Sequence, residues 1–361
     1  TNEYDLKRVI TFHGLVKGAK NFAEDHIKVN EWMHRSEQTT TKIYSEHVSG
    51  DMSSGERNKR INRLKDLNEG ERRILTNARC LSEGVDVPSL DGVAFIDPKH
   101  SPIDIVQAVG RAIRKSDEKT KGTIIIPVFL DEIENVDEQV LASKFATVWS
   151  VITALKSQDD ELLEKIDNLR IQLGTRKITK ITSKGFEKIH FDLPENINPK
   201  FYDSLYTVLV ENTSDDWLDN YGKLKEFKND YGHTTPNTKT TALGQWCMIQ
   251  RKNYRKNILW KERVKLLNDI NFDWEPNESE WQEKFQELKE FKKKNGHVIV
   301  PTAFTTLGHF VVNQRGSYKR GKLSQEKINL LNTIGFDWDP VETEWQNNFN
   351  KLIQYKAKFG H

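Results

Sequence analysis

The chain has 361 residues, of which 36% are hydrophobic and 30% charged; this composition is typical of a globular protein of two or three domains and excludes a disordered one. Lysine and arginine total 55 and aspartate and glutamate 53, so the net charge of +2 excludes a global basic field, and any nucleic-acid contact must come from local patches. Cys80 and Cys247 form no CxxC pair, which predicts neither a disulfide framework nor a metal site. This cysteine usage fits a reducing cytoplasm best, and because no apolar run approaches the roughly 20 residues of a membrane span, we expect no membrane partner.

Residues 1–132 alternate short apolar segments with polar, helical ones. The predicted strands are residues 8–12, 43–45, 73–76, 93–97 and 123–129, and helices are predicted around residues 19–33 and 54–67. Strands separated by helices of this length favour an α/β lobe in which helices flank a parallel, doubly wound sheet.

Residues 133–210 are expected to form a helical linker region. One long amphipathic helix is predicted there from apolar residues that recur at helical spacing: Leu141, Phe145, Val148, Ile152 and Leu155. Pro194 and Pro199 indicate a loop in the second half of this region, which has no clear period.

The last third of the chain contains an internal repeat with a period of 64 residues. The matching positions are Trp217, Trp281 and Trp345; Gly232-His233, Gly296-His297 and Gly360-His361; Leu243-Gly244 and Leu307-Gly308; Gln250-Arg251 and Gln314-Arg315; and Phe272-Asp273-Trp274 and Phe336-Asp337-Trp338. Repeats are predicted over 211–276 and 277–340, and residues 341–361 match the start of a third copy. We therefore expect a parent chain that is longer at both ends.

Each repeat is predicted to form an all-α domain of three helices. The first helix of the second copy has one apolar face, formed by Trp281, Phe285, Leu288 and Phe291. Gly296 is a typical helix end. A second helix is predicted from about Thr306 to Arg315, and Ser324 is a suitable N-cap for a third. The repeated tryptophans are therefore expected in the core, and the repeated histidines at helix ends or in the core and not at a zinc site.

The strongest functional signal is the segment 107–114, which has the form Q-x-x-G-R-x-x-R. On a helix, Gln107, Arg111 and Arg114 share one face, and Gly110 permits a close approach of another backbone. Two guanidinium groups on one face suit a polyphosphate, because each is a permanent forked donor and phosphoryl transfer needs positive charge where negative charge spreads in the transition state. A surface helix with solvated arginines is the alternative interpretation.

A second signal, residues 76–88, directly follows a predicted strand. Gly84, Asp86 and Pro88 indicate a sharp loop at the carboxyl end of that strand, where open α/β sheets bind ligands. An ordinary strand-to-helix turn is the alternative.

Along the chain, residues 76–88 come first, a predicted strand follows, and residues 107–114 come next. In this order the two segments resemble motif V and motif VI of superfamily 2 helicases, respectively. Residues 9–13 resemble motif IV, and residues 48–53, followed by Glu56-Arg57, resemble the stretch behind it. The 64-residue repeats are similar to the helicase-associated domain found in tandem behind bacterial helicase cores, through the leading Trp, the Gly-His, the Leu-Gly, the Gln-Arg and the closing Phe-Asp-Trp.

The resemblance implies the C-terminal RecA-like lobe of an ATP-dependent helicase. It makes Arg114 the arginine finger that reaches the γ-phosphate of ATP, with Arg111 near the phosphates and Gln107 sensing the nucleotide. By the same resemblance, Gly84 and Asp86 belong to the nucleotide side of the cleft, with Asp86 near the ribose.

Neither a G-x-x-x-x-G-K-[ST] loop nor a DEAD-like acidic box occurs in the 361 residues. Without them nothing cradles the β-phosphate or holds Mg²⁺. We therefore expect ATP and Mg²⁺ to be cofactors of the parent protein, a missing N-terminal RecA-like lobe to be a partner, and the chain alone to have negligible ATPase activity and no tightly bound cofactor.

Nucleic acid, DNA in preference to RNA, is the other expected partner. Basic residues recur near the end of the second helix of each repeat: Arg251, Lys252, Arg255 and Lys256 in the first, and Arg315, Lys319, Arg320 and Lys322 in the second. A tyrosine accompanies each cluster, Tyr254 and Tyr318, which suits phosphate contacts with some stacking. The resemblance adds Thr76 as a phosphate contact. A solvated lysine-rich face is the alternative.

Three functions are compatible with these observations. The parent is a motor that remodels or translocates on nucleic acid, a nucleic-acid-binding module in which the lobe is a scaffold, or the motor part of a restriction or defence system that translocates without separating strands. Replacement of Arg114 separates the first from the second, and strand-displacement assays separate the first from the third.

Overall fold

A computed structural model of the chain describes residues 6–33, 41–78, 90–96, 110, 122–128, 145–183, 186, 188–192, 199–301 and 305–361. The chain divides into two compact units, Thr1–Glu226 and Phe227–His361. In the described ranges, no helix combines the length and the apolar character that a membrane crossing requires.

The first unit contains a sheet of five parallel strands in the order β2-β3-β1-β4-β5. The strands are β1 (Arg8–His13), β2 (Lys42–Ser49), β3 (Glu71–Ala78), β4 (Gly92–Phe95) and β5 (Thr123–Ile125). The alternation of strands and helices along the chain therefore predicted a parallel sheet correctly. β2 and β3 are longer than their apolar segments because they pair with each other over their full length, with Glu46 and Arg73 in ion-pair contact across the pair.

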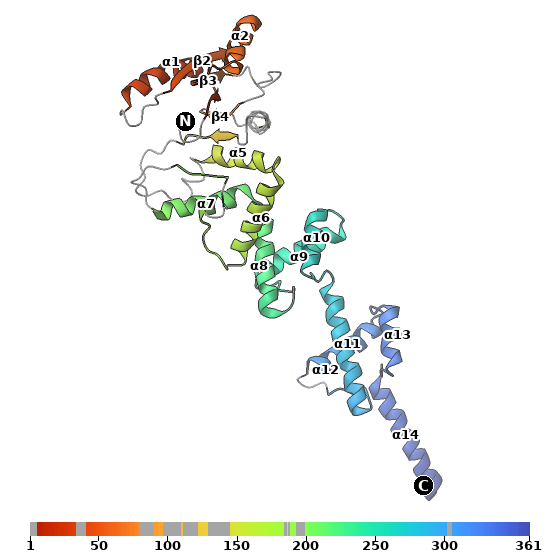
Figure 1. Cartoon of the computed structure of the whole chain (residues 1–361). Coiled ribbons are helices and arrows are strands. Elements are labelled where there is room, and N and C mark those ends of the chain that lie inside the picture. Colours follow the sequence, from red (N-terminus) through yellow and green to blue (C-terminus); the bar gives the residue numbers. More distant parts are fainter. Residues whose placement is uncertain are drawn as a thin grey trace. The chain divides into compact units, whose positions relative to one another are not determined.

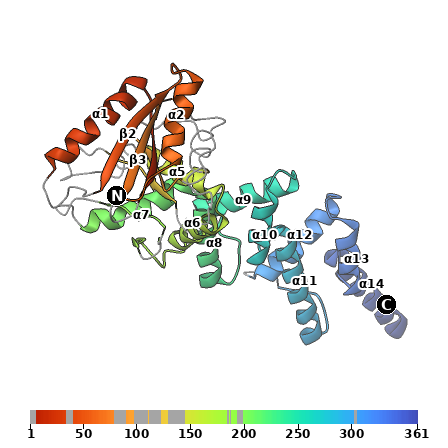
Figure 2. The same cartoon turned by 45° about the horizontal axis from the view of Figure 1, so that its top comes forward.

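Helices cover both faces of this sheet (Figure 2). Within the described ranges, the helices of the first unit include α1 (Val16–Trp32), α2 (Ser54–Lys65), α5 (Ala146–Lys156), α6 (Asp160–Gly174), α7 (Pro199–Thr213) and the first part of α8 (Asp216–Tyr231). α2 and α5 contribute Leu64 and Val151 to a core that also contains Leu75 of β3. Side chains alternate along a strand, so the neighbouring Thr76 points to the opposite face, where its hydroxyl donates a hydrogen bond to a carbonyl of α1.

The region after the sheet differs from the single long helix that the sequence predicts. The structure has two helices, α5 and α6, separated by residues 157–159. Asp159 accepts a hydrogen bond from the backbone N–H of Leu162 at 3.0 Å and so begins a new helix as its N-cap. Pro199 is the first residue of α7 and does not lie in a loop, because proline is well tolerated in the first turn of a helix; Pro194 and Leu141 lie outside the described residues.

A buried lysine and a pair of glycines are among the contacts that hold α5, α6, α7 and α8 together within the first unit. The Nζ of Lys156 is buried and donates hydrogen bonds to Asp167 Oδ1 at 2.9 Å and to the carbonyl of Thr213 at 2.8 Å, which ties α5 to α6 and α7. α6 and α8 touch at two glycines: a Cβ on Gly174 would lie 2.2 Å from the carbonyl oxygen of Asp219, and one on Gly222 would lie 2.2 Å from that of Ile171. Only residues without a side chain permit this approach of the two backbones.

The repeats consist of three helices each, as predicted (Figure 1). The remaining helices are α9 (Ala242–Arg255), α10 (Lys261–Asp269), α11 (Pro276–Asn295), α12 (Thr306–Lys319), α13 (Gln325–Thr333) and α14 (Pro340–Phe359). α8, α9 and α10 belong to the first copy, α11, α12 and α13 to the second, and α14 corresponds to the first helix of the third.

The second copy confirms the predicted core and the end signals at Gly296 and Ser324, whereas α12 runs beyond its predicted end at Arg315 to Lys319. Trp281 is 7% exposed and its indole N–H donates to Gln314 Oε1 at 2.9 Å. Gly296 ends α11 in the left-handed conformation, with φ +76°. The Nδ1 of His297 accepts the backbone N–H of Ile299 at 3.3 Å, which gives the repeated histidine its role at the helix end.

Candidate functional site

The carboxyl edge of the sheet gathers polar side chains that are buried. His13 at the end of β1, Ser49 at the end of β2 and Asn77 near the end of β3 are all less than 5% exposed. The imidazole Nε2 of His13 lies 2.9 Å from the hydroxyl of Thr11. Since the strands are parallel, these side chains share the edge at which open α/β sheets bind ligands.

The segments expected to face the nucleotide follow the strands that end at this edge. Residues 79–89, with Gly84 and Asp86, follow β3, and residues 97–120, with Gln107, Arg111 and Arg114, follow β4. All five of these site residues lie outside the described residues. Gly110 is described; it is helical and half-buried.

Thr76, expected to contact a nucleic-acid phosphate, is fully buried in this structure, with 0% of its surface exposed. Its hydroxyl donates a hydrogen bond of 2.6 Å to the carbonyl of Ala19, which ties β3 to α1. A phosphate contact would require that this bond break and that the sheet face open, so the structure gives Thr76 a packing role.

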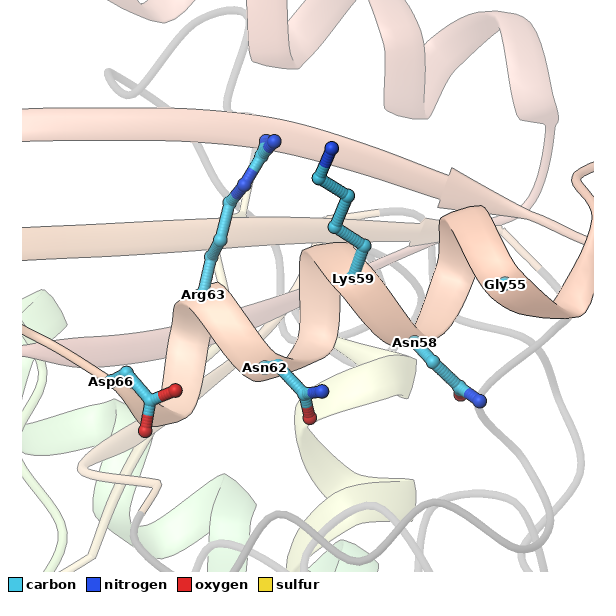
Figure 3. A pocket seen from close by; sticks show the side chains of 6 residues that line it. All are labelled: Gly55, Asn58, Lys59, Asn62, Arg63 and Asp66. Carbon is cyan, nitrogen blue, oxygen red and sulfur yellow. The ribbon is translucent and has the colours of Figure 1, made fainter.

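An open hollow runs along α2 and is lined by Gly55, Asn58, Lys59, Asn62, Arg63 and Asp66. Figure 3 shows Lys59 and Arg63 on one side of the helix and Asn58, Asn62 and Asp66 on the other. Arg63 forms an ion pair with Glu46 of β2. None of the six lining residues offers an aromatic or apolar side chain for a nucleotide base, so this hollow does not suit ATP.

The repeated Gln-Arg positions lie inside the repeats. Arg251 is 6% exposed, and its guanidinium lies over the ring of Phe272. Its Nε donates a hydrogen bond to the carbonyl of Asp273 at 2.8 Å, and a terminal nitrogen donates one to the carbonyl of Thr234 at 3.2 Å. Arg315 makes the equivalent Nε bond, to the carbonyl of Asp337 at 2.8 Å. Burial lowers the pKa of both arginines. These two side chains close the repeats, and in this structure they are not presented to a ligand.

The other predicted contact residues of the repeats are exposed. Lys252, Arg255, Lys319 and Arg320 reach solvent at the ends of α9 and α12. Arg255 pairs with Glu275, with 3.0 Å between Nε and Oε1. The Nζ of Lys319 lies 3.5 Å from Asp339, the residue equivalent to Glu275 in the next copy.

The tyrosines beside these cations are stacked on tryptophans. The ring centroids of Tyr254 and Trp274 are 4.0 Å apart, and those of Tyr318 and Trp338 are 4.2 Å apart. The hydrogen-bond partners of both indole N–H groups are asparagines of the third helix, Asn268 in the first copy and Asn332 in the second. Each tyrosine therefore already has an aromatic partner on one face.

Sequence reasoning missed the two repeated ion pairs and the inward direction of Arg251 and Arg315. The sequence contained a signal for both features, because the ion-pair residues and the arginines recur 64 residues apart in the two copies. A residue that recurs unchanged among core positions, as Arg251 and Arg315 do, is a candidate for the core even when it is charged. In the described part of the chain, no cluster of His, Cys, Asp or Glu is arranged to hold a metal ion.

Comparison with known families agrees with this architecture. The helicase conserved C-terminal domain matches residues 5–116, and the helicase-associated domain matches residues 214–275 and 278–339. The chain therefore contains a C-terminal helicase lobe followed by two helicase-associated repeats.

Among curated proteins, the chain is similar to "Probable helicase A859L" of African swine fever virus. Identity is 38% over 95 residues for isolate Pig/Kenya/KEN-50/1950 and 37% over 95 residues for strain Badajoz 1971 Vero-adapted. Each match covers 26% of this chain and 10% of the viral protein. The match thus spans about a tenth of the length of these relatives.

Two solved structures also match in part. The ATP-dependent Type ISP restriction-modification enzyme LlaBIII bound to DNA is 21% identical, with a TM-score of 0.44 over 94% of this chain and 21% of that chain. The C-terminal domain of the DEAD-box protein Dbp5 is 19% identical, with a TM-score of 0.27 over 40% of this chain and 71% of that chain.

Proposed function

We propose that this chain supplies the second lobe and the nucleic-acid-binding repeats of an ATP-dependent motor. The observation that carries the proposal is the position of the two motif segments in the strand order. β3 and β4 are the two neighbours of β1, so the chain passes from one side of β1 to the other between them. Ligands of open α/β sheets bind at the carboxyl edge where the chain makes such a switch, and both motif segments leave strands that end there.

The proposed chemistry is charge stabilisation. Arg114 acts as the arginine finger on the γ-phosphate, Arg111 neutralises neighbouring phosphate oxygens, and Gln107 senses the bound nucleotide. Guanidinium groups suit this task because they are permanently charged and donate in a fixed fork. Gly84 and Asp86 line the nucleotide side of the cleft.

ATP and Mg²⁺ are the proposed cofactors of the complete protein. The sequence has no G-x-x-x-x-G-K-[ST] loop to hold the β-phosphate. We therefore assign that task to a first RecA-like lobe, which is a required partner of this one. The 361-residue chain alone is expected to have negligible ATPase activity, and robust turnover by the pure chain would contradict this division of labour.

The repeats are proposed to bind nucleic acid, with DNA preferred to RNA. The support is local: exposed cations recur at equivalent positions, at Arg255 and Lys319 and again at Lys256 and Arg320, although the chain as a whole is nearly neutral. Contacts of this kind act on phosphates and do not by themselves select a base sequence.

The test is Arg114→Ala in the complete protein. Loss of an arginine finger lowers phosphoryl transfer by about 10³-fold or more, so ATP turnover should fall by that order while nucleic-acid affinity is kept. Lys265→Ala, which removes an exposed cation of α10, is the matched control and should leave turnover unchanged. Equal turnover in the wild type and in R114A would refute the motor assignment.

A further inference from the structure

The second helix of each repeat contains no acidic residue. α9 and α12 are 14 residues long, and neither contains an aspartate or a glutamate. All the other repeat helices, α8, α10, α11, α13 and α14, contain at least one. With 53 acidic residues in 361, a helix of this length would have about two. The same absence at the same place in both copies favours contact with a polyanion, because like charges repel.

Six exposed positions of α9 and α12 are equivalent, and Lys252 is exposed in α9 alone because its equivalent, Gly316, is half-buried. The exposed pairs are Ala242 and Thr306, Gln245 and His309, Met248 and Val312, Ile249 and Asn313, Tyr254 and Tyr318, and Arg255 and Lys319. The last turn keeps a cation in both copies, and a second cation follows directly, at Lys256 and Arg320. The middle of the face differs between the copies. One helix face therefore combines a constant cationic end with a variable centre.

From this face we infer that α9 and α12 are the DNA-contacting helices of the repeats, each lying in the major groove of duplex DNA. The last-turn cations contact phosphates, and the side chains at the middle of each helix face base edges. The inference rests on the proposed nucleic-acid binding and assigns it to one helix per repeat.

The dimensions of a helix favour duplex DNA as the occupant. An α-helix with its side chains is about 10–12 Å across, and the major groove of B-DNA is about 12 Å wide. The major groove of A-form RNA is deep and too narrow for side chains to read. A single strand would need aromatic faces on which its bases stack, and one face of each of Tyr254 and Tyr318 is taken by a tryptophan.

The ion pairs at the helix ends allow a phosphate to bind. Arg255 and Glu275 are 57% and 60% exposed, and Lys319 and Asp339 are 65% and 52% exposed. Exposed pairs of this kind contribute little to stability. A DNA phosphate can therefore replace the carboxylate as the partner of each cation.

The experiment places acidic charge on the proposed face. Gln245→Glu with Asn313→Asp changes one exposed residue in the first turn of α9 and one in the middle of α12, with almost no change of shape. Gln286→Glu with Asn347→Asp makes the same chemical change on exposed positions of α11 and α14 and is the matched control. Affinity of the 361-residue chain for a fluorescent DNA duplex is measured by anisotropy, and circular dichroism checks that all variants keep their helices.

The expected result is at least tenfold weaker binding for the α9/α12 pair, since each acid then faces base edges and phosphates across the groove, and less than twofold weaker binding for the control. Equal weakening by both pairs, or by neither, would overturn the assignment to α9 and α12 and would leave the proposed nucleic-acid binding standing. Absence of binding by the wild-type chain to any nucleic acid would overturn both.

A second measurement uses the wild-type chain alone. Methyl green, which occupies the major groove, should displace the chain from the duplex, and netropsin, which occupies the minor groove, should not. Displacement by netropsin alone, or tighter binding to single-stranded DNA or duplex RNA than to duplex DNA, would overturn the groove assignment.

Discussion

The same arginine occurs at equivalent positions of the two repeats, and in both it points inward. Arg251 donates to the carbonyls of Asp273 and Thr234, so it joins the closing segment of its repeat to the turn after the first helix. Arg315 keeps the bond to Asp337, equivalent to Asp273. Arg251 and Arg315 were expected at the surface because they stand beside exposed lysines. In the structure their guanidinium groups instead donate hydrogen bonds to backbone carbonyls inside the repeats.

Arg251→Ala should lower the free energy of unfolding of the first repeat by about 2 kcal/mol, because it leaves two carbonyls without a donor and removes a guanidinium from the Phe272 ring. Urea unfolding followed by tryptophan fluorescence measures the change. The neighbouring exposed Lys252 is the control, and its replacement by alanine should shift stability by less than about 0.5 kcal/mol. Equal effects of the two substitutions would contradict the structural role of Arg251.

Cys247 is the buried thiol of the first repeat. It is 0% exposed, and burial raises its pKa to about 12. The thiolate is the reactive form, so in a Cys80→Ser background Ellman's reagent at pH 8 should label Cys247 only as fast as the repeat opens, and completely in urea.

The folded pKa of Cys247 exceeds the unfolded value of about 8.5, so this thiol's contribution to the free energy of unfolding is full below pH 8.5 and declines as the pH rises above it. Rapid labelling of the native chain would contradict this burial.

At the scale of elements, the contact between α6 and α8 is fixed by two glycines. Gly174→Ala places a Cβ 2.2 Å from a backbone oxygen of α8, which no rotamer change can relieve, so the helices must separate. The expected loss is about 3 kcal/mol in the free energy of unfolding of the first unit, at the upper end for overpacking. Gly55→Ala in α2, where a Cβ meets nothing within 4 Å, is the control and should cost nothing. Thermal unfolding by circular dichroism compares them; a neutral Gly174→Ala would refute the close contact.

The elements differ in how well the sequence predicted them, for physical reasons. The second repeat was predicted almost completely, because Gly296 and Ser324 are local stop and start signals and two copies of the pattern support each other. The division into α5 and α6 was missed because the spacing of apolar residues does not mark where α5 ends. The new helix begins where a single residue, Asp159, acts as its N-cap. The α6–α8 contact could not be predicted at all, since a glycine in a helix gives no sign of what lies against it.

The candidate site was predictable to a different degree in each part. The motif residues Arg111 and Arg114 rest on sequence order alone, and their roles stay predictions. The exposed cations of the repeats were predictable from their repetition. Thr76 and Arg251 were not, because burial depends on contacts between segments distant in the chain: Thr76 bonds to Ala19 of α1.

At the scale of the whole molecule, a net charge of +2 means that attraction to DNA must come from a few local cations. Five exposed cations lie in the last turn of a second helix or directly follow it: Lys252, Arg255, Lys256, Lys319 and Arg320. If each neutralises one phosphate, the logarithm of the binding constant should fall with the logarithm of salt concentration with a slope of about −4.5.

Removing two of these cations should change that slope in a defined way. Lys256→Ala with Arg320→Ala takes away one exposed cation per repeat, so the slope should become shallower by about 2. Lys351→Ala with Lys356→Ala removes two exposed cations of α14 and should leave the slope unchanged, although it alters the net charge equally. Titrations at several salt concentrations measure both. If the two pairs change the slope equally, the attraction belongs to the overall field of the protein and not to the ends of α9 and α12; a wild-type slope near zero would mean that phosphates are not contacted at all.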